Sequence, residues 1–367
     1  MRDNREHVLK GVDRLRVGVD ARMLCSSGIG KVIENIVSRM IDDKPDWHFV
    51  LLGKMADFAK FPFTKKANVE LIPCNAPIYS IREQFEVPWK LPKNLDVLWC
   101  PHYNVPIFYH GRMVVTIHDL AHLALPEINK GFLKQAYAKI MFRAATKKAD
   151  QIACVSKFTI SELKKYVPSV DKKKIHLIYN GVDEKWFSIK KGKPVHDKPY
   201  FIFVGNVKPH KNLRRLIEAY KLASPNIKQD LILVGKKEGF INGENSISEL
   251  IKGFENRIIF TGYVSDKELM QYVAQADAMV FPSLYEGFGL PPLEAMAAGT
   301  PVLGSNTASV PEICKNHIVY FSPLDISDIE KNIAKAQDST ITPEVIRSIM
   351  LNYSWDSAAR KYVRLFK

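Results

Sequence analysis

The chain has 367 residues, of which 46% are hydrophobic and 25% charged, so it can form two domains with cores of their own and is neither disordered nor fibrous. It has no apolar run of about 18 residues, as a membrane-spanning helix would need, and no Cys-x-x-Cys pair among its five cysteines, as a zinc site would show. The net charge is +14, and residues 1–190 hold 31 Lys+Arg against 20 Asp+Glu, which indicates an anionic partner for the first half: membrane lipid, a phosphate-bearing acceptor or nucleic acid.

Short apolar strands alternate with helices along the whole chain, the pattern of parallel sheets built from βαβ units. In the first half we expect strands at 16–20, 48–52, 69–72, 97–100, 113–117, 151–155 and 175–179, and helices at 31–41 and 132–148. Residues 188–199, rich in Lys, Gly and Pro, are expected to be a linker. Beyond it we expect strands at 200–204, 231–234, 258–260, 278–281, 302–304 and 319–321, and a terminal helix at 355–366.

These elements predict an α/β protein with two Rossmann-like, doubly wound domains that face each other across a cleft. The expected limits are 1–190 for an acceptor-binding domain and 191–350 for a nucleotide-sugar-binding domain. The terminal segment 351–367 is expected to be a helix that returns to the first domain. Ligands of such sheets bind at the carboxyl ends of the strands.

The strongest motif is the segment 281–302, FPSLYEGFGLPPLEAMAAGTPV. A strand ends at Phe281, a glycine-bearing loop follows, and two prolines then fix φ for the first turn of a helix. Backbone N–H groups near the helix start would bind a pyrophosphate. Glu286 in the loop and Glu294 in the first turn can both face one ligand, although Glu294 alone could equally complement the helix dipole.

This segment resembles the family-4 retaining glycosyltransferases of the GT-B fold, whose Glu-x₇-Glu motif matches Glu286 and Glu294. The resemblance runs over nearly the whole chain from about Arg16. It implies that Glu286 holds hydroxyls of the donor sugar and acts in catalysis, and that Glu294 holds the donor ribose. It also implies that Phe288, Gly289 and Leu290 lend backbone groups to the sugar and phosphates.

A second motif, at 203–213, runs from a strand through a basic loop into a helix. Lys211 would lie where a diphosphate leaving group accumulates charge, so a fixed cation there stabilises the transition state. The family has an Arg and a Lys in this loop. Lys211 matches the Lys, but Asn206 stands at the Arg position. Lys208 or His210 would have to compensate for the missing positive charge. Asn206 and His210 are both predicted to contact the donor.

A third motif begins at Asp20, directly after the first strand. Gly28 and Gly30 resemble the glycine loop of the family, which brings a helix start close to the donor phosphate and the acceptor. Ile33 stands where a dinucleotide-binding fingerprint would need a third glycine, which argues against a dehydrogenase. Arg22 is a candidate for binding acceptor charge.

A fourth motif ends the strand at 113–117. His118 follows it, and the family places a functional histidine here, beside the 6-hydroxyl of the donor sugar. We therefore expect His118 to be catalytic and Asp119 to contact the acceptor. Ser156 and Lys157 match a Ser-x-x-Ser/Thr loop of the family loosely.

The sequence has no Asp-x-Asp pair, the usual metal clamp of the other large transferase fold. We therefore expect neither a cofactor nor a divalent metal. The expected reaction is transfer of a hexose with retention, mannose from GDP-mannose being the best guess because the motifs resemble bacterial surface-polysaccharide mannosyltransferases. UDP-glucose and dTDP-rhamnose are the alternative donors. The alternatives from other functional classes are a sugar-nucleotide epimerase and a nucleic-acid-binding protein, although the sequence has no motif typical of nucleic-acid recognition.

The acceptor is expected to be a saccharide on a lipid carrier. The start of the chain carries both signs of charge without an apolar segment behind it, which argues against a secretory signal, and the scattered, odd-numbered cysteines predict reduced thiols in a cytoplasm. The basic first domain predicts peripheral binding to the inner membrane face. Residues 130–174 hold twelve Lys+Arg against three acidic residues. An apolar strip beside them could lie in an anionic membrane surface or could equally pack on the domain's own sheet; it would consist of Phe132, Leu133, Tyr137, Ile140 and Met141.

Overall fold

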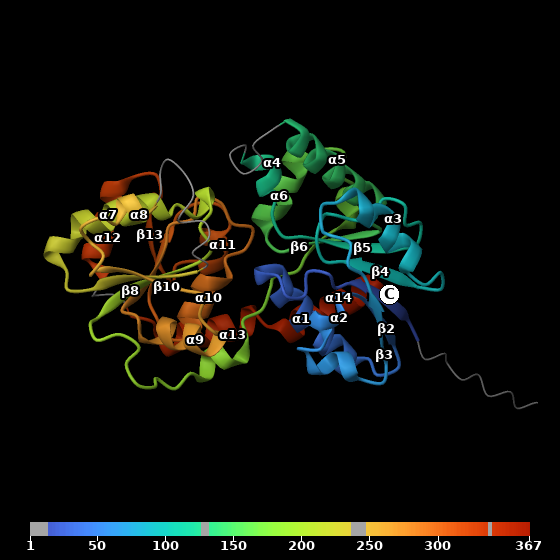
Figure 1. Cartoon of the computed structure of the whole chain (residues 1–367), viewed down its shortest axis with the longest axis horizontal. Coiled ribbons are helices and arrows are strands. Elements are labelled where there is room, and N and C mark those ends of the chain that lie inside the picture. The colour runs from blue at the N-terminus through green and yellow to red at the C-terminus, as the bar shows by residue number, and fades with distance from the viewer. Residues whose placement is uncertain (1–13, 126–131, 236–246, 337–339) are drawn as a thin grey trace, which may run out of the picture.

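The computed structural model describes residues 14–125, 132–235, 247–336 and 340–367. Figure 1 shows two lobes side by side, the blue-to-green first half of the chain and the yellow-to-orange second half, each with a parallel sheet between helices. The prediction of two Rossmann-like α/β domains is confirmed. No helix among these residues is both long and apolar enough to cross a lipid bilayer.

The first domain contains a seven-stranded parallel sheet of order β3-β2-β1-β4-β5-β6-β7. The strands β4 and β5 are buried at every position, because runs such as Met-Val-Val-Thr-Ile are covered on both faces. The bounds are β1 (Arg16–Asp20), β2 (His48–Gly53), β3 (Val69–Pro73), β4 (Val97–Cys100), β5 (Met113–Ile117), β6 (Gln151–Cys154) and β7 (Ile175–Leu177).

Helices cover both faces of this sheet. One face carries α1 and the other α3, α5 and α6, as the two hydrophobic clusters of the domain show. The bounds are α1 (Ser27–Asp43), α2 (Met55–Phe58), α3 (Ile81–Lys90), α4 (Ala121–Ala124), α5 (Phe132–Lys148) and α6 (Lys157–Tyr166).

The residues that were expected to form an apolar strip at the membrane do not form one exposed strip on α5. Met141 is buried and Tyr137 packs against the same cluster, because both face the domain's own sheet. Ile140 is 59% exposed. The side chains of Phe132 and Leu133 lie outside the described part of the structure.

The second domain contains a six-stranded parallel sheet of order β10-β9-β8-β11-β12-β13. Its strands are β8 (Tyr200–Val204), β9 (Asp230–Val234), β10 (Ile258–Gly262), β11 (Ala278–Phe281), β12 (Val302–Ser305) and β13 (Val319–Phe321). Its helices are α7 (Leu213–Ala223), α8 (Ile247–Leu250), α9 (Asp266–Gln275), α10 (Leu290–Ala297), α11 (Val310–Cys314), α12 (Ile326–Ala334) and α13 (Pro343–Asn352). Helices α7 and α12 pack on one face, whereas α10, α11 and α13 pack on the other.

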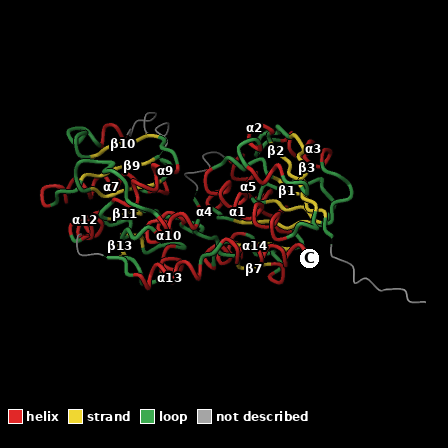
Figure 2. Tube along the Cα trace, turned by 90° about the horizontal axis from the view of Figure 1, so that it is seen from below, coloured by secondary structure: helices red, strands yellow, loops and turns green. Residues whose placement is uncertain are grey.

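The last helix, α14 (Trp355–Phe366), lies in the first domain, where it packs against α1 (Figures 1 and 2). Its Tyr362 hydroxyl lies 2.7 Å from the Thr116 hydroxyl of β5, and Arg112 donates to the carbonyl oxygen of Phe366 at 2.6 Å. The chain therefore crosses between the domains twice, once through the segment after β7 and once just before α14.

Candidate active site

The loop between β11 and α10 is held by a cation and a serine of its own domain. Lys211 Nζ, in the turn after β8, lies 2.5 Å from Glu286 Oε1. Ser309 Oγ donates to the carbonyl oxygens of Glu286 and Phe288 at 2.9 and 2.8 Å. The two residues expected to act on the donor sugar and its diphosphate are thus brought together and fixed.

Helix α10 begins at this loop with unpaired backbone donors. Gly289 is its N-cap at φ 98°, a left-handed conformation that favours glycine. In the described part of the chain the N–H groups of Phe288, Gly289 and Leu290 donate to no protein acceptor. Such a helix start binds anions. Glu294, 7% exposed, lies in the next turn.

The Glu286 loop docks directly on the first domain. A Cβ on Gly287 would lie 1.7 Å from the carbonyl oxygen of His118, so only glycine fits this contact. Ser156 Oγ and Thr159 Oγ1, at the start of α6, donate to the Gly287 carbonyl at 2.6 and 3.1 Å. The loosely matched Ser156 therefore joins the two domains, and its partner Thr159, which was not named from the sequence, is the Ser/Thr position of the same loop.

A carboxylate of the second domain reinforces this contact. Both oxygens of Glu312, in α11, accept from the backbone N–H groups of Lys157 and Phe158, at 2.7 and 2.9 Å. The acid therefore lies at the N-terminal end of α6, where it is favoured by the helix dipole. Lys157 contributes its backbone here.

His118 lies at the carboxyl end of β5 beside this contact. Its Nε2 lies 2.7 Å from the carbonyl oxygen of Pro101, which can only accept, so Nε2 carries the proton of a neutral ring. Burial lowers the pKa of His118 from its usual 6.5, which keeps the ring neutral at pH 7. Its neighbour Asp119 is exposed, and its Oδ1 accepts from the N–H of Ala121 at the start of α4.

The glycine loop after β1 brings a lysine to the second domain. A Cβ on Gly30 would lie 2.4 Å from the carbonyl oxygen of Leu24, so this position needs glycine, whereas Gly28 has open space around it. The next residue, Lys31, places Nζ 3.1 Å from Glu294 Oε1. Lys31 was missed in the sequence, where its signal was its place directly after the second glycine.

In the basic loop, the cation that is held in place is Lys211, which pairs with Glu286 of the same domain. Asn206 and Lys208 are exposed. His210 is buried, and burial lowers its pKa, so at pH 7 it is neutral and does not replace the missing arginine charge. The suggestion that His210 compensates electrostatically is therefore not supported by its environment.

Arg22 is enclosed in a network of buried charges. Its guanidinium contacts Asp20 at 2.6 Å and Glu83 of α3 at 2.9 Å, and the side chain is 2% exposed. Burial alone would raise the pKa of Asp20, but the charge and hydrogen bonds of Arg22 outweigh it and hold that pKa well below its usual range. The arginine is thus already paired with two carboxylates, and binding of acceptor charge by Arg22 stays a prediction.

Two protein families match successive parts of the chain. Residues 27–186 match Glycosyltransferase Family 4, and residues 184–349 match Glycosyl transferases group 1. Both segments thus belong to glycosyltransferase families, and the chain is a glycosyltransferase. Of the residues of this glycosyltransferase that were predicted to bind the donor, Glu294 and the loop from Glu286 to Gly289 lie where its two matched segments meet in space.

Two curated relatives of this glycosyltransferase act in bacteria. The O-antigen chain mannosyltransferase RfbU of Salmonella typhimurium (strain LT2) is 29% identical over 249 residues, which are 67% of each chain. The serotype-specific mannosyltransferase WbdA of Escherichia coli is 30% identical over 250 residues, which are 64% of this chain and 30% of WbdA. The match therefore spans less than a third of that longer relative.

The fold is shared with solved glycosyltransferase structures. Anabaena Alr3699/HepE, solved in complex with UDP-glucose, superposes with a TM-score of 0.73 at 18% sequence identity, covering 96% of this glycosyltransferase and 99% of that chain. This likeness establishes the GT-B arrangement of the two domains.

Proposed function

We propose that this glycosyltransferase transfers mannose from GDP-mannose, with retention at the anomeric carbon, onto a saccharide carried by a lipid. The mannosyltransferase relatives support the sugar. The observation that carries the proposal is the Lys211–Glu286 pair beside the open N-terminal end of α10 and against His118. It places a carboxylate, a cation and free N–H donors together, which suits a sugar diphosphate.

The chemistry requires positioning and charge stabilisation rather than a protein nucleophile. The bond from the anomeric carbon to the diphosphate oxygen breaks, and the acceptor hydroxyl oxygen bonds to the same face of that carbon. The departing phosphate oxygen takes the hydroxyl proton, so the products are a glycoside and a nucleoside diphosphate. Lys211 and the N–H groups of α10 stabilise the leaving charge, while Glu286 orients the sugar hydroxyls.

We assign the second phosphate cation to Lys31. The family's arginine is replaced by Asn206, and of the two lysines of the basic loop Lys211 is held by Glu286 whereas Lys208 is exposed. Lys31 reaches Glu294 from the opposite domain, and ribose hydroxyls that bind this carboxylate would compete with the ammonium for it. The ammonium would then be close to the diphosphate that follows the ribose.

A thermal-shift series with GDP, UDP and dTDP tests the donor assignment. GDP should raise the melting temperature most, because a ligand that binds only the folded state stabilises it by mass action. The variant Glu294→Gln should lose most of that gain, since the ribose contact is weakened. A larger gain from UDP or dTDP contradicts GDP-mannose, and product formation with each nucleotide sugar then identifies the donor.

Attachment to an anionic membrane would bring the enzyme to a lipid-linked acceptor. Helix α5 supports it, because its exposed face is basic and its sequence contains no acidic residue. The exposed cations of that face are Lys134, Lys139, Arg143 and Lys147. Each lysine near an anionic surface contributes about 1 kcal/mol, and added salt weakens the attraction.

A further inference from the structure

Helix α3 exposes a line of large apolar side chains. Ile81, Phe85 and Trp89 follow one another at intervals of four residues, so they share one side of the helix, and they are 79%, 62% and 83% exposed. Phe108, 51% exposed, extends the line, with its ring centroid 5.1 Å from that of Phe85. We call these four residues the α3 stripe.

The opposite side of α3 packs into the first domain and so holds the stripe toward the solvent. Glu83 is buried and pairs with Arg22, and Val87 lies in the core. Gln84 accepts from the N–H of Ile107 at 2.7 Å, and a capping box at Ser80 defines the start of the helix. The stripe is therefore held outward by a helix whose inner side belongs to the network at the carboxyl end of β1.

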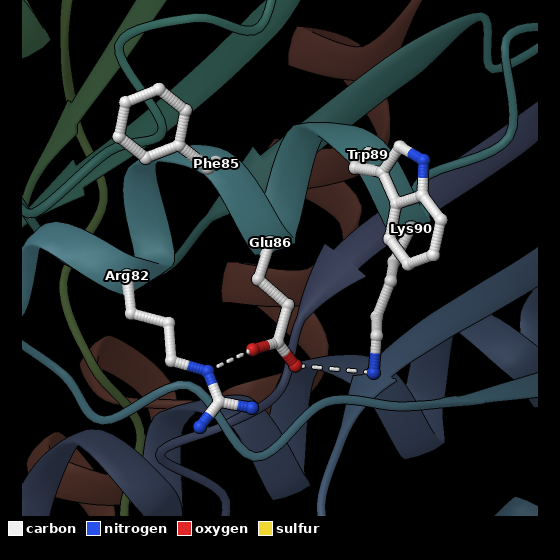
Figure 3. A pocket seen from close by; sticks show the side chains of 5 residues that line it. All are labelled: Arg82, Phe85, Glu86, Trp89 and Lys90. Carbon is white, nitrogen blue, oxygen red and sulfur yellow. Dashed lines mark hydrogen bonds and ion pairs between the residues drawn. The ribbon is translucent and has the colours of Figure 1, made fainter.

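Charged side chains accompany the stripe. Figure 3 shows Arg82 and Lys90 converging on Glu86, at 2.5 and 3.1 Å, beside Phe85 and Trp89. With two cations for one carboxylate, this group carries one net positive charge. The five residues line an open hollow of about 700 Å³.

The basic face of α5 belongs to the same side of the domain. Val87 of α3 and Met141 of α5 pack in one hydrophobic cluster, so the two helices cover the same face of the sheet and turn their exposed sides away from it. They also meet at Asn104, which hydrogen-bonds Glu83 of α3 and accepts from Tyr137 of α5. An apolar, aromatic stripe and a row of cations thus lie on one layer.

This combination points to one class of partner. Soluble proteins rarely expose a continuous group of large apolar side chains without a binding function. Tryptophan and phenylalanine on one side of a helix, with lysine and arginine beside them, are typical of helices that lie in the interface of an anionic bilayer.

We propose that the α3 stripe inserts into the boundary between headgroups and acyl chains of an anionic membrane, while the cations of α5 contact the headgroups. The use of this attachment rests on the proposed transfer to a lipid-linked acceptor. The attachment itself can be measured without donor or acceptor. Membrane insertion can therefore be refuted while the proposed transfer reaction stands, and the reverse.

Tryptophan fluorescence reports insertion at one residue. Of the five tryptophans, Trp89 is exposed, whereas Trp47, Trp99, Trp186 and Trp355 are at most 4% exposed. Brominated lipids in vesicles of phosphatidylglycerol and phosphatidylcholine should therefore quench Trp89 in the full-length protein. The variant Trp89→Phe should still bind these vesicles but lose the quenching. Vesicle binding without quenching of Trp89 would overturn insertion.

Vesicle co-sedimentation tests the energetic role of the stripe. Phe85→Ser/Trp89→Ser should bind anionic vesicles at least about tenfold more weakly, because two aromatic side chains no longer leave water. The control Leu351→Ser, 74% exposed in α13 of the other domain, should bind like the original protein. Activity on a water-soluble acceptor should be the same in all three proteins.

Two results would overturn the proposal. One is unchanged vesicle binding by the double variant. The other is a dimer, measured by sedimentation velocity, that the double variant converts to a monomer, because the stripe would then contact a second copy of the chain.

Discussion

The ammonium of Lys31 lies 3.1 Å from Oε1 of Glu294, so a cation of the first domain holds the carboxylate that we assign to the donor ribose. The negative charge of Glu294 raises the pKa of Lys31, so the lysine is charged at neutral pH. The position that we propose for the donor ribose is thus occupied by an ion pair between the domains, which donor binding would have to replace.

We expect Lys31→Met to weaken binding of the nucleoside diphosphate by about tenfold, which corresponds to loss of a charge-assisted hydrogen bond. Lys31→Arg should keep most of the affinity, because the charge is retained. Isothermal titration measures both, with the exposed Lys54→Met as control. Equal affinity in Lys31→Met and the original enzyme would contradict the phosphate role.

Glu286→Gln and Lys211→Met should each lower turnover by about 10² or more, as when one electrostatic partner of a transition state is lost. The two side chains are only 14% and 18% exposed and pair with each other, so each variant leaves a poorly solvated partner. A small fall in melting temperature is therefore expected, and circular dichroism should show an unchanged fold. Near-normal turnover in either variant would refute the assignment.

Gly287→Ala should reduce turnover strongly while each domain keeps its own core. The added methyl group has no room against the His118 carbonyl oxygen, so the Glu286 loop must move away from the first domain. Gly192→Ala, whose new atom would meet only the flexible side chain of Gln271, is the matched control. If Gly287→Ala turns over like this control, the contact is unimportant for catalysis.

Activity should survive an excess of EDTA. The expectation rests on the missing Asp-x-Asp pair and on Lys211, Lys31 and the N–H groups of α10 as the groups that neutralise the diphosphate. Initial rates with and without EDTA decide the question. Inactivation that Mg²⁺ or Mn²⁺ reverses would disprove metal independence.

His118 should make the fold less stable as the pH falls below about 6.5. Burial lowers its pKa in the folded state, so the unfolded chain takes up the proton first and is favoured in that range. His118→Gln should lose less melting temperature between pH 8 and 5.5 than the original protein, with exposed His110→Gln as control. An identical loss in His118→Gln would show that other groups dominate.

The sequence predicted the sheets well because parallel strands buried on both faces are short, continuous apolar runs. The strands 97–100 and 113–117 were predicted to the residue. Helix α3 was missed, since Pro88 lies inside it and its outward side is apolar rather than polar. Its capping box, Ser80 and Glu83, was the available signal.

The site was predictable where one motif carries both partners and less so where partners come from different domains. Glu286 and Glu294 are separated by only seven residues, and their loop follows from the glycines and prolines around them. The contacts of Lys31 with Glu294 and of Ser156 with Gly287 join residues far apart in the chain. No local pattern of charge or hydrophobicity encodes such a pair, because it depends on how the two domains meet.

The return of α14 to the first domain has a consequence for how the protein is made. Tyr362 and Phe366 complete a core whose buried members outside α14 lie between Val17 and Ile178, before the second domain in the chain. The second domain is contiguous apart from the crossing segments, so it can finish folding while the first still lacks one helix. During translation the first domain therefore stays incomplete, with the α1 side of its sheet partly uncovered, until α14 has left the ribosome.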